Sequence, residues 1–244
     1  MVKIIAIDGP SASGKTQIAK KLSKDLDAPL LISGRLYRAV ALETINKKIN
    51  LSNKKEILKC VKNIDDVYLN SKKLYSPEID SISSRISSIK ELRLKLLKYQ
   101  RDFPRKHFSS KKYVIIEGRD IGTEIFPNAD FKIFMWASSY VRAQRRVAQI
   151  AETKKKPNIS QIHKAIITRD RRDMTRKIAP LIPAADSYLI CTDFSDKEVT
   201  FNTIIKIIKK KLLMNQSTLM RSNRRLKQPI SQSQVKIKRT VIQR

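Results

Sequence analysis

The chain has 244 residues, with 52 Lys or Arg against 22 Asp or Glu and a formal net charge of +30. This length suits one globular domain that carries an insertion, and a hydrophobic content of 41% excludes a wholly disordered chain. The only cysteines, Cys60 and Cys191, exclude a disulfide framework and a cysteine zinc site, and they indicate a reducing compartment. No apolar run reaches the roughly 18 residues of a membrane span or resembles a signal peptide, so we expect a cytoplasmic protein.

The chain opens with the pattern of a strand, a loop and a helix. Residues 3–7 form an apolar run rich in β-branched side chains, and a turn with glycine and proline follows it. Over residues 17–26, isoleucine and leucine recur every four positions, which predicts an amphipathic helix. The first structural unit is therefore a buried strand followed by a helix.

Four later apolar runs predict further strands, and helical patterns separate most of them. The runs cover residues 29–32, 113–116, 131–136 and 188–191. The helical patterns cover residues 35–47, about 91–102, and the segment that follows residue 195. Short buried strands that alternate with helices are typical of a parallel sheet covered on both faces. We therefore predict an α/β fold around a five-stranded parallel sheet.

Two parts of the chain depart from this pattern. Residues 67–74 suggest a hairpin and residues 79–88 are rich in serine, so we interpret this region as an insertion. Residues 215–244 contain eight basic residues and no acidic one, which predicts a disordered basic tail. Such a tail could bind nucleic acid or an anionic membrane surface.

Residues 9–16 read Gly-Pro-Ser-Ala-Ser-Gly-Lys-Thr and fit the phosphate-loop pattern G-x-x-x-x-G-K-[ST] at each defined position. The motif lies between a predicted strand and a predicted helix, where backbone N–H groups and the helix N-terminus can surround phosphate. In such a loop the lysine reaches the β and γ phosphates and the threonine hydroxyl holds Mg²⁺. We therefore expect ATP to be bound by Gly9, Pro10, Ser11, Ala12, Ser13, Gly14, Lys15 and Thr16, with Thr16 as the Mg²⁺ ligand.

Seven arginines lie in or beside the predicted loops and helix ends where such a sheet gathers its ligands. Phosphoryl transfer depends mainly on positioning and charge stabilisation, to which planar guanidinium groups are suited. For any one of them, a solvated surface charge is the simpler interpretation. The seven are Arg38, Arg93, Arg119, Arg169, Arg171, Arg172 and Arg176.

Four blocks of sequence, in order, resemble the bacterial cytidylate kinases, a branch of the nucleoside monophosphate kinases. The blocks are IAIDGPSASGKT, SGRLYRAVA, EGRDIGTEIFPNADFKIF and TRDRRDMTRKIAPLIPAADSY. The segment LYSPEIDSISSRISSIKELRLKLL is similar to the enlarged monophosphate-binding insertion of that branch. The resemblance covers about residues 2–212. It implies a P-loop NTPase fold with a kinase domain over 1–214, an insertion over about 61–103, and a lid over about 152–160.

The same resemblance implies an activity. The γ-phosphoryl group of ATP would pass to CMP or dCMP by direct in-line transfer, with Mg²⁺ as the cofactor and no covalent enzyme intermediate. The partners would be ATP and CMP or dCMP, and we expect a monomer. Closure of the lid and the insertion would exclude water so that ATP is not simply hydrolysed.

The resemblance also implies roles for individual residues. The catalytic set would be Lys15, Arg119 and Arg169. The CMP-binding set would be Ser33, Tyr37, Arg38, Ser84, Arg93, Gly118, Arg119, Asp120, Arg169, Asp173 and Arg176. The cytosine edge would be read by Ser84, Arg93 and Asp120. An aspartate that accepts from the exocyclic amine, beside donors to the ring acceptors, would reject uracil.

Three positions depart from the family pattern and leave alternatives open. Ile32 stands where the family usually has Asp, Arg35 replaces a small residue, and Glu117 replaces an Asp. The first two changes could mark a shift towards UMP or dTMP, whereas Glu117 either polarises a Mg²⁺-bound water or pairs with an arginine. The high charge also leaves open a P-loop protein that chiefly binds nucleic acid through its basic surface and tail. A basic group at Arg142, Arg145 and Arg146 either approaches ATP or is a solvated helix face.

Overall fold

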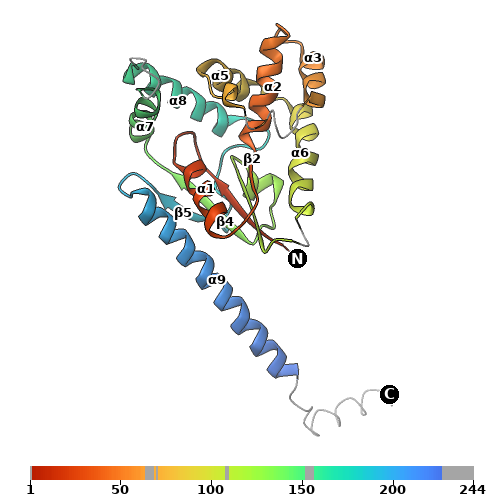
Figure 1. The fold of residues 1–244 in the computed structure, drawn as a ribbon, viewed down its shortest axis with the longest axis vertical. Coiled ribbons are helices and arrows are strands. Elements are labelled where there is room, and N and C mark those ends of the chain that lie inside the picture. Colours follow the sequence, from red (N-terminus) through yellow and green to blue (C-terminus); the bar gives the residue numbers. More distant parts are fainter. Residues whose placement is uncertain (1, 64–68, 70, 108–109, 152–156, 227–244) are drawn as a thin grey trace, which may run out of the picture. The chain divides into compact units, whose positions relative to one another are not determined.

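The computed structural model describes residues 2–63, 69, 71–107, 110–151 and 157–226 (Figure 1). The chain divides into two compact units, Met1–Phe201 and Asn202–Arg244. The first unit holds the sheet and each residue that the sequence places in the site. Within the second, the described residues continue a helix that begins in the first unit. A search of the described residues finds no helix with the length and apolar character to cross a membrane.

The first unit is built on a parallel sheet of five strands in the order β2-β3-β1-β4-β5. The strands are β1 (Lys3–Asp8), β2 (Leu30–Ile32), β3 (Tyr113–Gly118), β4 (Phe131–Trp136) and β5 (Tyr188–Cys191). Each strand lies where an apolar run predicts it, so the predicted α/β class and strand number are confirmed. β1 and β3 are paired in register from Lys3 opposite Tyr113 to Asp8 opposite Gly118, which brings their carboxyl ends together.

Helices connect the strands. They are α1 (Lys15–Asp25), α2 (Gly34–Asn46), α3 (Lys54–Lys59), α5 (Pro77–Ile86), α6 (Lys90–Arg105), α7 (Ser139–Ala151), α8 (Ile159–Thr175) and α9 (Lys197–Leu226). Two 3₁₀ turns span Cys60–Asn63 and Lys72–Leu74, and a π turn, η3, spans Ile121–Ile125. The helices predicted after β1, after β2 and before β3 are present as α1, α2 and α6.

Both faces of the sheet are buried at its inner strands β1 and β3. On one face, Ala6, Val114 and Ile116 pack with Leu97 and Phe103 of α6. Side chains alternate along a strand, so the intervening residues of β1 and β3 point to the opposite face. Of these, Ile5, Ile7 and Ile115 are fully buried. Apolar runs with no polar alternation are therefore what this sheet requires.

Helices α5 and α6, which lie in the expected insertion, share a hydrophobic core with α2 and α3. Leu36 and Val40 of α2 cluster with Ile57 of α3, Ile86 of α5 and Leu92 of α6. Helix α5 starts at Pro77, and the Ser76 hydroxyl accepts a hydrogen bond from Ile79 N at 3.2 Å. Proline in the first turn after a serine cap is a strong helix start, so the serine-rich segment is helical.

Three predictions on connecting segments have different outcomes. The hairpin over 67–74 is wrong at Lys72–Leu74, which form a 3₁₀ turn, and 67, 68 and 70 lie outside the described residues. The lid over about 152–160 falls between α7 and α8, with 152–156 outside the described residues. The disordered tail over 215–244 stays a prediction, and the structure continues α9 to Leu226. No proline or glycine interrupts residues 197–226, so the helix ends only shortly before Pro229.

Candidate active site

The phosphate loop connects β1 to α1, as its motif predicts. Gly9 has φ of 148°, and a Cβ there would lie 2.0 Å from the Met135 carbonyl oxygen. Gly14, with φ of 90°, and Ala12, with φ of 57°, also adopt left-handed backbone. These residues bend the chain into a tight loop, and Gly9 cannot carry a side chain without displacing β4.

Lys15 is buried at the start of α1. Its Nζ donates to the Pro10 carbonyl at 2.8 Å and lies 3.6 Å from Glu117 Oε1. Burial lowers the pKa of Lys15 to about 7, and the positive charges of Arg119 and Arg169 act in the same direction, against Glu117. The three residues expected to be catalytic therefore share one electropositive site.

Thr16 and Glu117 supply oxygen atoms next to Lys15. The Thr16 hydroxyl donates to Glu117 Oε2 at 2.8 Å. Glu117 lies on β3 opposite Ile7 of β1, so strand pairing carries its carboxylate to the phosphate loop. Mg²⁺ favours oxygen donors and is held by few protein ligands together with substrate phosphates. A hydroxyl and a carboxylate beside a phosphate loop fit that requirement.

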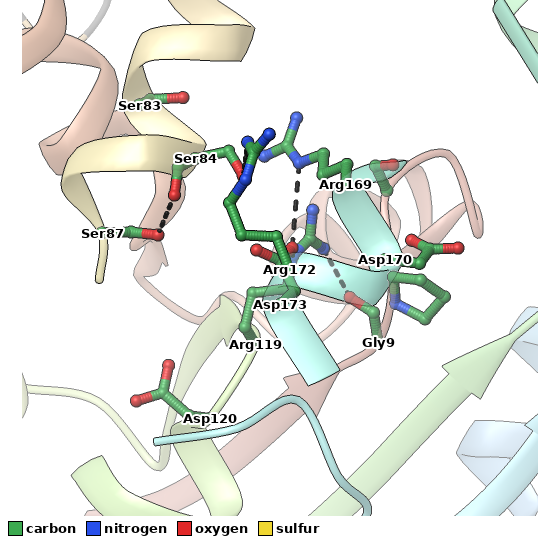
Figure 2. Close-up of polar contacts among 12 residues, drawn as sticks. Gly9, Ser83, Ser84, Ser87, Arg119, Asp120, Arg169, Asp170, Arg172 and Asp173 are labelled. Carbon is green, nitrogen blue, oxygen red and sulfur yellow. Dashed lines mark hydrogen bonds and ion pairs between the residues drawn. The ribbon is translucent and has the colours of Figure 1, made fainter. Parts of the chain in front are cut away.

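Arg119 connects the phosphate loop to helix α8. Its Nη1 donates to the Gly9 carbonyl, and its Nε donates to Asp173 Oδ2 at 3.2 Å (Figure 2). Arg169 Nε lies 3.8 Å from the same Asp173 oxygen and is buried without a hydrogen-bond partner among the described residues. Burial and the charge of Arg119 lower the pKa of Arg169 to about 10. This corner of the site holds two cations on one carboxylate and has capacity for an anion.

Asp80 of α5 binds three arginines from three other helices. Its carboxylate forms ion pairs with Arg38 of α2 and Arg146 of α7, and a third with Arg169 of α8 at 3.4 Å. Arg38 and Arg169 belong to the expected CMP-binding set, whereas no motif identified Asp80. From the sequence, Asp80 is one acidic residue in the expected insertion, and this does not identify the arginines that it binds.

A second group of expected CMP ligands lies around Asp120. Arg93 forms an ion pair with the Asp120 carboxylate, and Arg176 Nη2 lies 3.7 Å from it. The Arg93 guanidinium also lies 5.5 Å from the centre of the Tyr37 ring. Burial raises the pKa of Tyr37 to about 12. The structure thus brings together Tyr37, Arg93, Asp120 and Arg176.

The remaining expected residues lie at the edges of these groups. Ser33 N donates to the Glu117 carbonyl at 2.9 Å, and a Cβ at Gly118 would lie 3.0 Å from Ser33 Oγ. Ser84 accepts a hydrogen bond from Arg172 Nη1 at 2.9 Å (Figure 2). Arg172 belongs to the predicted arginine group, but the resemblance assigned it no role.

Asp8 is a buried carboxylate that sequence reasoning missed. It accepts from Ile121 N at 2.8 Å and from Gly122 N at 2.7 Å, and so it fixes η3 next to Asp120. Burial raises the pKa of Asp8 to about 7 despite these hydrogen bonds. Its position at the end of β1, directly before the glycine of the motif, was the available signal.

The basic group of α7 is engaged with other residues. Arg142 binds Asp170 with both terminal nitrogens and donates to the Ser11 carbonyl at 3.3 Å. Arg145 donates to Thr192 Oγ1 at 3.0 Å, and Arg146 pairs with Asp80. Of the two interpretations, a solvated face is therefore wrong, and Arg142 reaches the phosphate loop.

The structure shows where two residues that depart from the family pattern lie and what they contact. Arg35 Nε donates to the Tyr75 hydroxyl at 2.9 Å, and the Arg38 guanidinium lies 5.0 Å from the centre of the Tyr75 ring. Ile32 lies on β2 opposite Glu117. The Arg35 charge thus lies beside the elements that hold the Asp80 group.

Comparisons with known proteins agree with this geometry. The sequence profile of the family described as Cytidylate kinase matches residues 5–212. A cytidylate kinase from Fusobacterium nucleatum is 37% identical over 219 residues, which cover 86% of this chain and 96% of the relative. One from Thermotoga maritima is 35% identical, with 85% and 97% covered, and one from Caldicellulosiruptor saccharolyticus is 36% identical, with 80% and 91% covered. The chain belongs to the cytidylate kinase family.

Proposed function

We propose that this protein transfers the γ-phosphoryl group of ATP to a phosphate oxygen of CMP or dCMP, and so forms ADP with CDP or dCDP. Membership of the cytidylate kinase family supports this activity. The structural observation that carries it is Arg119, whose guanidinium binds both the phosphate loop at Gly9 and the helix α8 carboxylate of Asp173. One cation thus faces the donor loop and the expected acceptor side together.

The mechanism needs charge stabilisation rather than a covalent intermediate. Lys15, Arg119 and Arg169 neutralise negative charge on the transferring group, because phosphoryl transfer spreads charge over the equatorial oxygens. The surroundings of these partly buried cations have a lower dielectric than water, which strengthens each interaction with phosphate. The acceptor oxygen attacks in line, and the leaving group is ADP.

Mg²⁺ would be held by the Thr16 hydroxyl, with the Glu117 carboxylate acting beside it. When bound, it would supply positive charge that offsets the negative charge of the donor phosphates. Glu117 also pairs with Lys15, so the carboxylate keeps both groups at the same end of α1.

The acceptor base would be read around Asp120. In this arrangement the carboxylate accepts from the exocyclic amine of cytosine, and Arg93 and Ser84 donate to the ring acceptors. Asp120 is 5% exposed and is held by two arginines, and an ionised carboxylate can only accept hydrogen bonds. Uracil presents a carbonyl where cytosine presents the amine, which leaves that acceptor unpaired.

A coupled assay tests the proposal. ADP formation is measured with CMP, UMP, AMP and dTMP, and kcat/KM is compared between them. We expect CMP to lead, and Lys15→Ala protein to be inactive with all four. If UMP or dTMP leads, the substrate assignment is wrong, and the Ile32 and Arg35 changes become its first explanation.

A further inference from the structure

The serines of α5 and its C-terminal end use their hydroxyl groups in two different ways. The hydroxyls of Ser83, Ser87 and Ser88 donate to backbone carbonyls three residues earlier, at 3.1, 2.8 and 2.7 Å. Ser84 differs, because its Oγ accepts from Arg172 at 2.9 Å and the described residues include no acceptor for its own hydrogen. Ser84 is nevertheless only 3% exposed. A buried hydroxyl hydrogen without an acceptor is costly unless a ligand supplies one.

The contact with Arg172 sets the polarity of the Ser84 hydroxyl. A hydroxyl has one donor and two acceptor sites, whereas a guanidinium can only donate. With an arginine N–H on one lone pair and no acceptor among the described residues, the hydroxyl hydrogen points away from Arg172 and is left for an acceptor on a ligand. Figure 2 shows the Ser84 side chain pointing from α5 towards Arg172 on α8.

Two arginines, Arg93 of α6 and Arg176 at the end of α8, also contact the C-terminal end of α5. Arg176, at the C-terminal end of α8, donates to Ser87 Oγ at 3.4 Å, and Arg93 donates to the Ser87 carbonyl at 3.1 Å. Because Arg93 and Arg176 also bind Asp120, the end of α5 is joined to the proposed base site. Ser84 therefore lies one helical turn from Ser87, which contacts both of the arginines that bind Asp120.

We propose that Arg172 is a specificity-determining positioning residue, which orients the Ser84 hydroxyl as a hydrogen-bond donor and so favours cytosine over uracil. This inference rests on the proposed function and adds a residue to it. Ring position 3 of cytosine is an acceptor, and in uracil it is an N–H donor. A hydroxyl that donates forms a hydrogen bond with cytosine at this position, whereas its hydrogen faces the N–H hydrogen of uracil.

The test separates this role from a general effect on the site. kcat/KM is measured with CMP and UMP for the wild type, Arg172→Met, Ser84→Ala and the double variant. We expect Arg172→Met to lower the CMP to UMP ratio about tenfold, the cost of one misdirected buried hydrogen bond. In the Ser84→Ala background the same change should leave the ratio unaltered, because no hydroxyl remains to orient.

Arg171→Met is the matched control. It removes the same charge one position earlier on α8, where the side chain is exposed, and should leave the ratio within twofold of wild type. Should Arg172→Met fail to fold, Arg172→Gln replaces it, because glutamine is polar but too short to reach Ser84 in the same way, and the same fall in ratio is expected.

Two results would overturn the proposal. One is an unchanged CMP to UMP ratio in the Arg172 variant, and the other is an equal fall in ratio when Ser84 is already alanine. Failure of the proposed function has a different signature, in which the wild type itself does not prefer CMP.

Discussion

The Thr16 hydroxyl donates to the Glu117 carboxylate at 2.8 Å, although the two residues are 101 positions apart in the chain. The contact exists because β1 and β3 are neighbouring parallel strands, so that the phosphate loop after one lies beside the end of the other. The second carboxylate oxygen faces Lys15 at 3.6 Å. One carboxylate therefore joins the proposed Mg²⁺ ligand to the lysine of the phosphate loop.

Glu117→Gln tests this junction, because it keeps the shape and a hydrogen-bond acceptor but removes the charge. We expect kcat to fall about 10- to 100-fold, in line with loss of one preorganised charge. The Mg²⁺ concentration for half-maximal rate should also rise, because the oxygen set at Thr16 loses its negative partner. Rates are measured over a MgCl₂ titration. Glu124→Gln, an exposed glutamate of η3, is the control, and an unchanged Mg²⁺ dependence in Glu117→Gln would contradict the role.

Lys15→Ala and Arg119→Ala should each lower turnover by orders of magnitude. Each removes a cation from the site where charge develops on the transferring group, and such cations are worth about 10³-fold or more. Thermal unfolding should change little, because both cations are held near other positive charges in the empty site. Lys20→Ala, an exposed lysine on α1, is the matched control. Near-normal turnover in either variant would show that the catalytic set is wrong.

Lys15 should bind a proton when ATP binds. Its pKa in the empty site is about 7, below its ordinary value of 10.5, because of burial and Arg119. At pH 8 the amine is therefore largely neutral, and a bound triphosphate raises its pKa and protonates it. We expect uptake of about one proton per ATP at pH 8. Calorimetry in three buffers of different ionisation enthalpy measures this number. Lys15→Met should show none, and equal uptake in that variant would assign the proton to another group.

Asp80→Asn should bind CMP more tightly. In the empty site the Asp80 carboxylate occupies Arg38 and Arg169, which both belong to the expected CMP-binding set. Removing its charge frees them and ends like-charge repulsion with the incoming phosphate. We expect a Kd for CMP about three- to tenfold lower by calorimetry, as for loss of about 1 kcal/mol of competing ion pair. Glu78→Gln, exposed on the same helix, should have no effect. Weaker binding in Asp80→Asn would instead mean that Asp80 holds the arginines in a productive position.

The sheet and the phosphate loop were predictable because both depend on local pattern. Apolar runs identify the five buried strands, and the motif demands glycine at Gly9, where the backbone has φ of 148°. The sequence predicts the order of the strands less directly. Once β1 and β3 pair, however, the loop before α1 and the end of β3 must meet. Topology therefore brings together Lys15 and Arg119 of the expected catalytic set, whereas the position of Arg169 depends on the packing of α8.

The pairing of charges was not predictable. Arg171 and Arg172 are adjacent and chemically identical, yet one is exposed and the other contacts Ser84 on α5. The difference depends on which face of α8 packs against α5, a tertiary property. Asp80 was missed for the same reason, since its three partners come from helices that are distant in sequence. The turn at Lys72–Leu74 shows a different error, because the polar composition of this segment suggested a hairpin where the chain forms a 3₁₀ turn.

Gly9→Ala should destabilise the protein, whereas Gly34→Ala should not. An alanine Cβ at position 9 would meet the Met135 carbonyl at 2.0 Å, and φ of 148° is a backbone conformation that L side chains rarely adopt. The loop and β4 would have to separate, at a cost of about 2 kcal/mol or more. Gly34 has no heavy atom of the described residues within 4 Å of its ideal Cβ and lies in the first turn of α2, where alanine is favoured over glycine. Urea unfolding of the two variants measures the difference. Equal stability would mean that the phosphate loop tolerates a side chain against β4, and the requirement for glycine would then have to come from the bound phosphate instead.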